Sequence, residues 1–238
     1  MIRLLYVPLI LLLVMGPHPS GATAKSLTII HSNDMHSHFL GAPPNIDYTP
    51  SVTGDDRTLG GWARIAAVIK KVKQERSNPV LIVDAGDFLM GSLYHMLSRE
   101  QAFELRLLSM MGYDAVCLGN HEFDLKPDGL AKILARARSS GNIPPIVASN
   151  VIFSAESKKD DALETIFDQG VVKPLRVIEK GGLRIGLFGL MGKDAAEVAP
   201  FAAPVSFADP IATAQKMVAV LRETQNVDLV ICLPNLPI

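Results

Sequence analysis

Three short polar clusters in this chain combine side chains that bind divalent metal ions and move protons. They are Asn33-Asp34-Met35-His36-Ser37-His38, Asp84-Ala85-Gly86-Asp87 and Gly119-Asn120-His121-Glu122-Phe123-Asp124. Their carboxylate, imidazole and amide donors, with no thiolate, suit hard or borderline cations such as Zn²⁺, Mn²⁺, Co²⁺ or Fe²⁺. Each cluster alone also has an ordinary structural interpretation: a Gly-Asp pair makes a turn, and Asn120 and Glu122 would cap a helix start. The three together, each directly after an apolar run, indicate a metal site.

The apolar runs predict the strands that position these clusters. Their lack of alternation is typical of strands covered on both faces, and they lie at Leu27–His31, Val80–Val83, Ala115–Leu118, Ile146–Ala148, Arg184–Leu190 and Leu229–Leu233. Apolar residues at helical spacing predict helices at Trp62–Arg76, Gln101–Met111, Asp128–Arg138 and Pro210–Gln225. Alternating strands and helices predict an α/β fold with a mainly parallel sheet. Since ligands bind beyond the carboxyl ends of such strands, we expect the clusters to converge there.

Two segments are predicted to be loops, and two cysteines leave a question open. Gly41–Gly60 is rich in Pro, Gly and Asp, and Ser154–Gln169 is rich in charge. Cys117 and Cys232 each lie in an apolar run that predicts a buried strand. They are either two inert thiols or a disulfide between adjacent strands, and sequence separation does not decide between these.

Composition and the first residues narrow the class of protein. The 238 residues are 48% apolar, and 23 Lys and Arg oppose 24 Asp and Glu, for a net charge of −1. This is globular composition, without the basic excess of a protein that binds nucleic acid by bulk charge. Residues 1–24 are predicted to be a signal peptide, with Arg3 before a short apolar stretch and Ala22-Thr23-Ala24 as the cleavage pattern. We therefore expect a periplasmic or secreted protein without a membrane anchor after cleavage, and residues 25–238 as one domain.

The three clusters resemble the signature blocks of the calcineurin-like metallophosphoesterases. They are most similar to the secreted 5′-nucleotidase branch, which includes UDP-sugar hydrolase and 2′,3′-cyclic phosphodiesterase relatives. Gly60-Gly61-Trp62-Ala63-Arg64 also resembles that branch, and the resemblance runs from about Ser26 to the C-terminus. It implies a β-sandwich of two mixed sheets flanked by helices, in the order α/β/β/α, that holds two divalent metal ions.

The resemblance also implies a role for each metal ligand. Asp34 and His36 would bind the first metal, and Asp87 would bridge both metals with its two carboxylate oxygens. Asn120 would bind the second metal through its amide oxygen. A water activated by the metals would attack the phosphate of a nucleotide or other small phosphoester.

Two further residues are implied in catalysis rather than in metal binding. His121, when charged, would stabilise the negative charge that develops on the phosphoryl and leaving oxygens, and Asp124 would orient its ring. The expected activity is therefore that of a phosphoric-ester hydrolase of the 5′-nucleotidase type.

The chain departs from the family pattern after His121, which is its last histidine. Asn235 stands about where the first of several later histidines is expected, so the implied ligand set is incomplete. The smaller C-terminal nucleotide-binding domain that the resemblance implies is expected to lie outside this chain, and the second sheet is expected to be incomplete. We expect the chain to be the N-terminal part of a longer enzyme.

These departures keep two alternatives open. One is an inactive metal-binding fragment, and the other is a thiosulfohydrolase-like relative of the same fold. The substrate, the metal and the oligomeric state are not indicated by the sequence.

Overall fold

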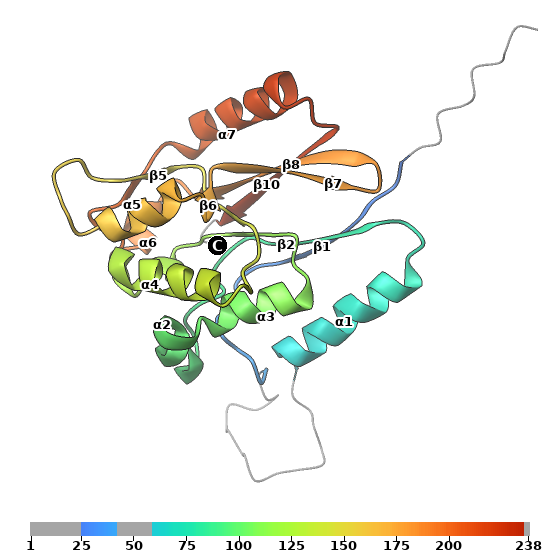
Figure 1. Cartoon of the computed structure of the whole chain (residues 1–238), viewed down its shortest axis with the longest axis horizontal. Helices are drawn as coiled ribbons and strands as arrows, with labels where there is room; N and C mark the ends of the chain where they lie inside the picture. Colours follow the sequence, from blue (N-terminus) through green and yellow to red (C-terminus); the bar gives the residue numbers. More distant parts are fainter. Residues whose placement is uncertain (1–24, 42–58, 236–238) are drawn as a thin grey trace, which may run out of the picture.

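The protein has four layers, two β-sheets packed face to face with helices on both outer sides (Figure 1). The structure is a computed structural model that describes residues 25–41 and 59–235. The predicted signal peptide and most of the predicted loop 41–60 lie outside the described residues. The α/β/β/α architecture expected from the resemblance is confirmed.

The first sheet contains five parallel strands in the order β1-β2-β3-β4-β6. Their bounds are β1 (Thr28–Ser32), β2 (Val80–Asp84), β3 (Ala115–Cys117), β4 (Ile146–Val147) and β6 (Val172–Lys173). Its outer face packs on α1 (Trp62–Glu75), α3 (Phe103–Met111), α4 (Lys126–Ser139) and α5 (Asp161–Asp168). A 3₁₀ turn at Leu93–Leu97 and the short helix α2 (Ser98–Gln101) precede α3. The expectation that both sheets are mixed is wrong for this one, which is parallel throughout.

The second sheet has three strands in the order β10-β8-β7. The strand β8 (Leu183–Met191) is parallel to β10 (Leu229–Asn235) and antiparallel to β7 (Leu175–Lys180). Its outer face is covered by α7 (Pro210–Ala219), which continues into a π-helical turn at Val220–Thr224. The short α6 (Ala195–Val198), a 3₁₀ turn at His121–Phe123 and an antiparallel pair, β5 (Val151–Ile152) with β9 (Ser206–Phe207), complete the described elements.

Alternating side chains build the core on the two faces of each sheet. On β2, Leu81 and Val83 point between the sheets, whereas Val80 and Ile82 pack under the helices. Close contact of the sheets requires a glycine on β8, because a Cβ at Gly189 would lie 2.5 Å from Cys117 Sγ and 2.7 Å from the Val147 carbonyl oxygen.

Both cysteines are free thiols, and they lie in different layers. Cys117 is buried between the two sheets, whereas Cys232 packs on the α7 side of the second sheet. The structure therefore favours the two separate thiols over the disulfide.

Several sequence-based predictions of elements are corrected by the structure. The loop predicted at Ser154–Gln169 contains α5, because Leu163 and Ile166 are enough to bury one face of a short charged helix. The helix predicted at Gln101–Met111 is broken at Ala102, whose φ of 47° is left-handed. The edge strand β7 was not predicted, because it is only half-buried and carries Arg, Glu and Lys among its apolar residues. Within residues 25–41 and 59–235, no helix has the length and apolar character to cross a bilayer.

Candidate metal centre

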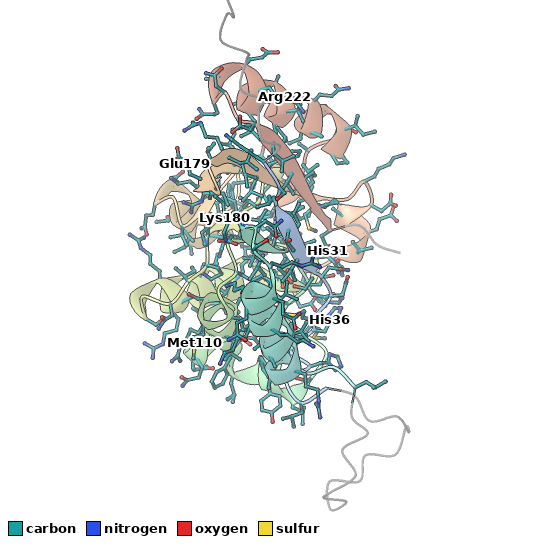
Figure 2. All side chains as sticks on the ribbon, turned by 90° about the vertical axis from the view of Figure 1, so that its right-hand side faces the viewer. His31, His36, Met110, Glu179, Lys180 and Arg222 are labelled. Carbon is teal, nitrogen blue, oxygen red and sulfur yellow. The ribbon has the colours of Figure 1, made fainter. Side chains whose placement is uncertain are left out.

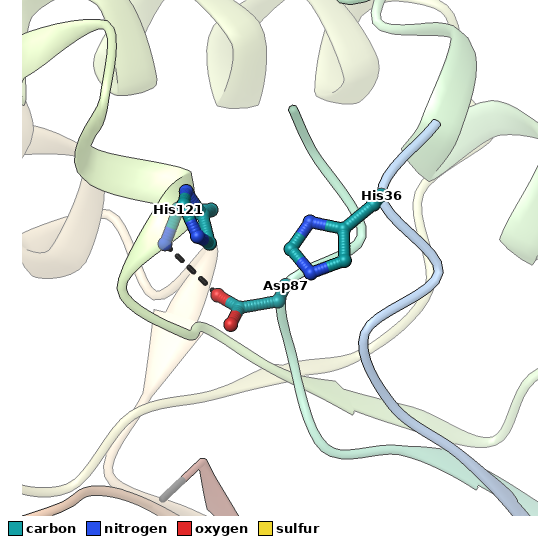
Figure 3. Close-up of side chains that lie close together, drawn as sticks. All are labelled: His36, Asp87 and His121. Carbon is teal, nitrogen blue, oxygen red and sulfur yellow. Dashed lines mark hydrogen bonds between the residues drawn. The ribbon is translucent and has the colours of Figure 1, made fainter. Parts of the chain in front are cut away.

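Three residues from three different loops meet at the carboxyl ends of the first sheet (Figure 3). His36 follows β1, Asp87 follows β2 and His121 follows β3. Each offers a nitrogen or oxygen ligand atom, and these atoms all lie within 4.8 Å of one another. The two imidazole rings stand edge to face with their centroids 4.9 Å apart. The prediction that the clusters converge is confirmed. Three nitrogen and oxygen donors at this distance are enough protein ligands for one divalent metal ion.

The backbone of these loops adopts a conformation that side chains normally avoid. Asp34, His36, Ser37 and Asp87 have φ values of 52°, 45°, 50° and 56°, all in the left-handed region. Each such non-glycine residue costs of order 1–3 kcal/mol when it is strained, and such residues cluster at functional sites. Because of this turn, Asp34 and His36 do not have strand geometry. Two residues with the spacing Asp-x-His can direct both side chains at one metal ion only if the chain turns in this way.

Hydrogen bonds between the first two loops hold this conformation. The backbone N–H groups of Asp34, His36 and Ser37 donate to the carbonyl oxygens of Gly86, Asp87 and Phe88, each at 3.0 Å. The loops thus continue the pairing of β1 with β2 beyond the sheet.

Each histidine ring is oriented by one hydrogen bond to its Nδ1. The Nδ1 of His36 lies 3.2 Å from the Leu89 carbonyl oxygen, so it carries the proton and leaves Nε2 free for a ligand. Asp34 Oδ1 lies 3.7 Å from that Nε2, which brings Asp34 to the site beside His36. The Nδ1 of His121 lies 2.7 Å from Asp124 Oδ2. Such bonds are what metal-binding and charge-stabilising imidazoles need, since they fix the ring and the proton.

The fully buried Glu122 ties the second and third loops together. Its Oε2 accepts hydrogen bonds from the backbone N–H groups of Asp87 at 2.9 Å and Gly119 at 2.5 Å, and its Oε1 accepts one from Leu89 at 3.0 Å. The interpretation of Asn120 and Glu122 as a helix start holds in part, since a 3₁₀ turn at His121–Phe123 begins after Asn120. The Glu122 carboxylate also reaches the loop after β2, which a cap does not require. Sequence reasoning missed this role; the signal was a carboxylate next to a proposed metal residue in an otherwise apolar run.

Three carboxyl groups are buried at this edge of the sheet. Asp84, Asp87 and Glu122 are all buried, and no Lys or Arg of the described chain forms an ion pair with them. Burial raises the pKa of Asp84 to about 7, and burial also raises the pKa values of Asp87 and Glu122. A buried carboxylate is costly unless it is compensated. A divalent cation beside Asp87 would supply that compensation, so these residues fit a metal ion.

Asn120 and Asn235 are hydrogen-bonded to each other, and Asn235 reaches Asp87. The side-chain amide of Asn120 donates from Nδ2 to the Val198 carbonyl oxygen at 3.3 Å, which leaves its Oδ1 available to a ligand. Asn235, at the end of β10, accepts a hydrogen bond from the Asn120 backbone N–H at 3.3 Å, and its side chain hydrogen-bonds the Asp87 carboxylate. The structure thus brings His36, Asp87 and His121 together, with Asp34 beside His36 and Asp124 beside His121. Asn120 joins them through its hydrogen bond to Asn235, which contacts Asp87.

The fold and the site define a class before any relative is considered. A sandwich of two sheets between helices, with oxygen and nitrogen donors at the strand ends, is an α/β domain with a candidate metal centre. More particularly, a family model described as calcineurin-like phosphoesterase matches residues 27–232, and the chain belongs to this family. Members of the family use divalent metal ions, in agreement with the donors found here.

Individual relatives agree with the family. The chain is 32% identical to a probable 5′-nucleotidase of Treponema pallidum, over 88% of this chain and 32% of that protein. It is 29% identical to an apyrase of Tabanus yao, over 91% of this chain and 36% of the apyrase. Among solved structures, a 5′-nucleotidase precursor from Thermus thermophilus superposes with a TM-score of 0.69 at 32% identity, covering 88% of this chain and 37% of that one. The chain thus spans about a third of the length of these relatives.

Proposed function

We propose that this chain is the catalytic domain of a metal-dependent phosphoric-ester hydrolase of the 5′-nucleotidase type. The observation that carries the proposal is the convergence of His36, Asp87 and His121 within 4.8 Å at the carboxyl ends of three parallel strands. Membership of the calcineurin-like phosphoesterases and relatives named 5′-nucleotidase and apyrase support a nucleotide phosphate as the substrate.

Four residues would hold the metal ions. We assign Asp34, His36 and Asp87 to a first ion, and Asp87 with the amide oxygen of Asn120 to a second. Their oxygen and nitrogen donors suit Zn²⁺, Mn²⁺, Co²⁺ or Fe²⁺. Bound ions of this kind supply Lewis-acid activation of water and neutralise phosphate charge.

His121 and Asp124 would act on the leaving group rather than on the metal. The 2.7 Å contact between His121 Nδ1 and Asp124 Oδ2 fixes the orientation of the imidazole, with Nε2 directed away from Asp124. A fixed donor of this kind would stabilise negative charge as it develops on the phosphoryl and leaving oxygens. Glu122 would keep Asp87 in place through the backbone bonds described above.

An assay of phosphate release tests the proposal. The metal-loaded protein should release phosphate from AMP and from an aryl phosphate, slowly because the implied ligand set is incomplete, and EDTA should stop the reaction. Asp87→Asn should abolish turnover, whereas Asp128→Asn, an exposed aspartate that pairs only with Lys132 among the described residues, should not. Metal binding without any phosphate release would contradict the proposal and support the inactive metal-binding fragment.

We also propose that residues 1–24 are removed on export, so that the mature protein begins at Lys25. The support is the leader pattern in the sequence, and the Thermus relative is likewise named a precursor. N-terminal sequencing of protein from a periplasmic or culture-medium fraction should begin at Lys25. A soluble cytoplasmic protein that retains Met1 would contradict this.

A further inference from the structure

A groove with a volume of about 710 Å³ runs between α1 and α3, on the outer side of the helical layer. Its floor and walls are mostly apolar and include Phe39, Trp62, Ile69, Leu107 and Met110. In Figure 1 the two helices lie side by side, and in Figure 2 Met110 lies on the same flank of the molecule as α1. None of the residues assigned above to the metal centre lines the groove. Its volume is that of a site for a small organic ligand.

Two features of the groove are costly as they stand. The Met110 side chain is 74% exposed although it is apolar. Trp62 is buried, yet its indole Nε1–H has no hydrogen-bond acceptor in the part of the chain that the structure describes. An unpaired buried donor is rare in folded proteins, because it loses its bond to water and gains none in return. Both features would be relieved by a ligand with an apolar body and a hydrogen-bond acceptor.

The charge at the rim indicates the sign of that ligand. Lys70 and Lys73 line the groove, and none of its described lining residues is acidic. By contrast, Lys71, one position away on the same helix, forms an ion pair with Glu75 outside the groove. Two exposed lysines thus border an apolar surface with no acidic side chain among its described walls. This combination is complementary to an anion joined to a hydrocarbon chain.

We propose that the groove between α1 and α3 binds a small amphipathic carboxylate, such as a medium-chain aliphatic acid. Its hydrocarbon chain would cover the apolar walls and exclude water from them. Its carboxylate would accept charge-assisted hydrogen bonds from Lys70 and Lys73. Any oxygen that reaches Trp62 would satisfy the indole N–H.

The position of Trp62 makes the test direct, because it is the only tryptophan of the chain. Decanoate is titrated into the EDTA-treated full chain below its micelle concentration, with tryptophan fluorescence as the readout. We expect a saturable change for decanoate and a much weaker one for decyltrimethylammonium, which has the same chain and the opposite charge. EDTA keeps any metal-bound carboxylate from contributing. Equal affinity for the two amphiphiles, or no saturable change, would overturn the proposal.

Charge variants locate the carboxylate. The double variant Lys70→Gln/Lys73→Gln should weaken decanoate binding by about fivefold to tenfold, which is what two partly exposed ion pairs contribute. Lys71→Gln is the matched control, because it removes a lysine of the same helix that points elsewhere, and it should bind normally. If both variants bind as the unmodified chain does, the assignment of the anionic end is wrong.

A filling variant locates the hydrocarbon chain. Ala66 lines the groove, whereas its neighbour Ala67 is exposed and does not. Ala66→Phe should abolish binding measured by calorimetry, and Ala67→Phe should preserve it, with circular dichroism to verify that both variants fold. Undiminished binding by a folded Ala66→Phe would overturn the proposal. A dimer would overturn the proposal as well, if decanoate does not dissociate it and Ala66→Phe does. A second copy of the chain would then be the occupant of the groove.

Discussion

The two sheets contribute very differently to the candidate metal centre. The loops after β1, β2 and β3 of the first sheet supply all six residues assigned to metal binding and catalysis. Among the described residues, the second sheet brings Asn235 at the end of β10 against Asp87. The first set carries the charged groups and is interlocked by backbone bonds and by Glu122, whereas Asn235 is a neutral amide that makes hydrogen bonds. We therefore expect residues of the first sheet to determine whether a metal ion binds. We expect Asn235 of the second sheet to change the metal affinity only slightly.

The largest effect is expected at the residue shared by the two proposed metal positions. Asp87→Ala removes the carboxylate that lies between the two histidines, so Mn²⁺ or Zn²⁺ affinity should fall by more than about 100-fold. Changes of residues that merely support ligands already cost about 10–100-fold. Isothermal titration of the variant and the unmodified chain measures this. An unchanged isotherm would mean that the first sheet does not hold the metal.

The next effect separates metal binding from catalysis within the first sheet. His121→Ala should lower kcat for AMP by about 10²–10³, the cost of losing one charge-stabilising donor. Metal content, measured by atomic emission, should change much less. Parallel loss of metal and activity would instead make His121 a metal ligand, which its place in the 4.8 Å cluster allows geometrically.

Glu122→Gln tests whether the interlocking of the loops matters. One oxygen of the Glu122 carboxylate accepts two backbone N–H groups and the other accepts one. A glutamine must point its NH₂ group at one of these donors, so we expect metal affinity to fall by about 10–100-fold. Glu156→Gln, which changes an exposed glutamate, is the control and should bind metal normally. Equal affinities for the two variants would show that Asp87 needs no such support.

A smaller effect is expected from the second sheet. Asn235→Ala removes the hydrogen bonds to Asp87 and to the Asn120 backbone, each of which contributes about 1 kcal/mol to folding. Because these bonds exist without metal as well as with it, metal affinity should fall only a few-fold. Asn235→His should recover it or exceed it, since an imidazole at this place can bind a metal directly. Calorimetry on both variants provides the test. A loss at Asn235→Ala as large as that at Asp87→Ala would remove the distinction between the sheets.

The smallest effect concerns the pH dependence of stability without metal. The pKa of Asp84 is raised by burial from its ordinary 3.8 to about 7. Between these values the folded chain holds a proton that the unfolded chain releases, so the unfolding free energy should decrease as the pH rises. Asp84→Asn should make the decrease in unfolding free energy with pH shallower. Part of the decrease should remain in the variant, because burial also raises the pKa values of Asp87 and Glu122. Urea unfolding in EDTA at about pH 5 and about pH 7.5 measures the slope, and an identical slope in the variant would contradict the expectation.

Much of the first sheet could be predicted from the sequence, because buried strands leave uninterrupted apolar runs. The run at Val80–Val83 is an example, since β2 is buried along its whole length. Strand β7 escaped prediction because an edge strand tolerates charge: Arg176, Glu179 and Lys180 interrupt its apolar pattern. The break at Ala102 escaped it as well, because alanine does not signal a left-handed residue and tertiary packing imposes that conformation.

The sequence predicted which residues form the candidate site, but it did not predict the hydrogen bonds that hold them in place. The order of the three clusters along the chain, each at a strand end, is visible in the sequence and places His36, Asp87 and His121 together. Glu122 looked like a helix cap because its partners, the N–H groups of Asp87 and Leu89, lie more than thirty positions away. Such a contact depends on how close two loops come, which is decided by the distance between β2 and β3 and not by local spacing.

The placement of the two cysteines in separate layers gives the protein a built-in pair of labelling sites. Burial raises the pKa of the Cys117 thiol well above its usual range and that of Cys232 to about 11, so neither reacts readily in the folded state. An alkylating reagent reaches the buried Cys117 only when the two sheets separate, whereas the half-buried Cys232 becomes accessible when α7 is displaced. The relative rates of alkylation at the two positions would therefore distinguish opening of the whole sandwich from local loosening of its outer helix.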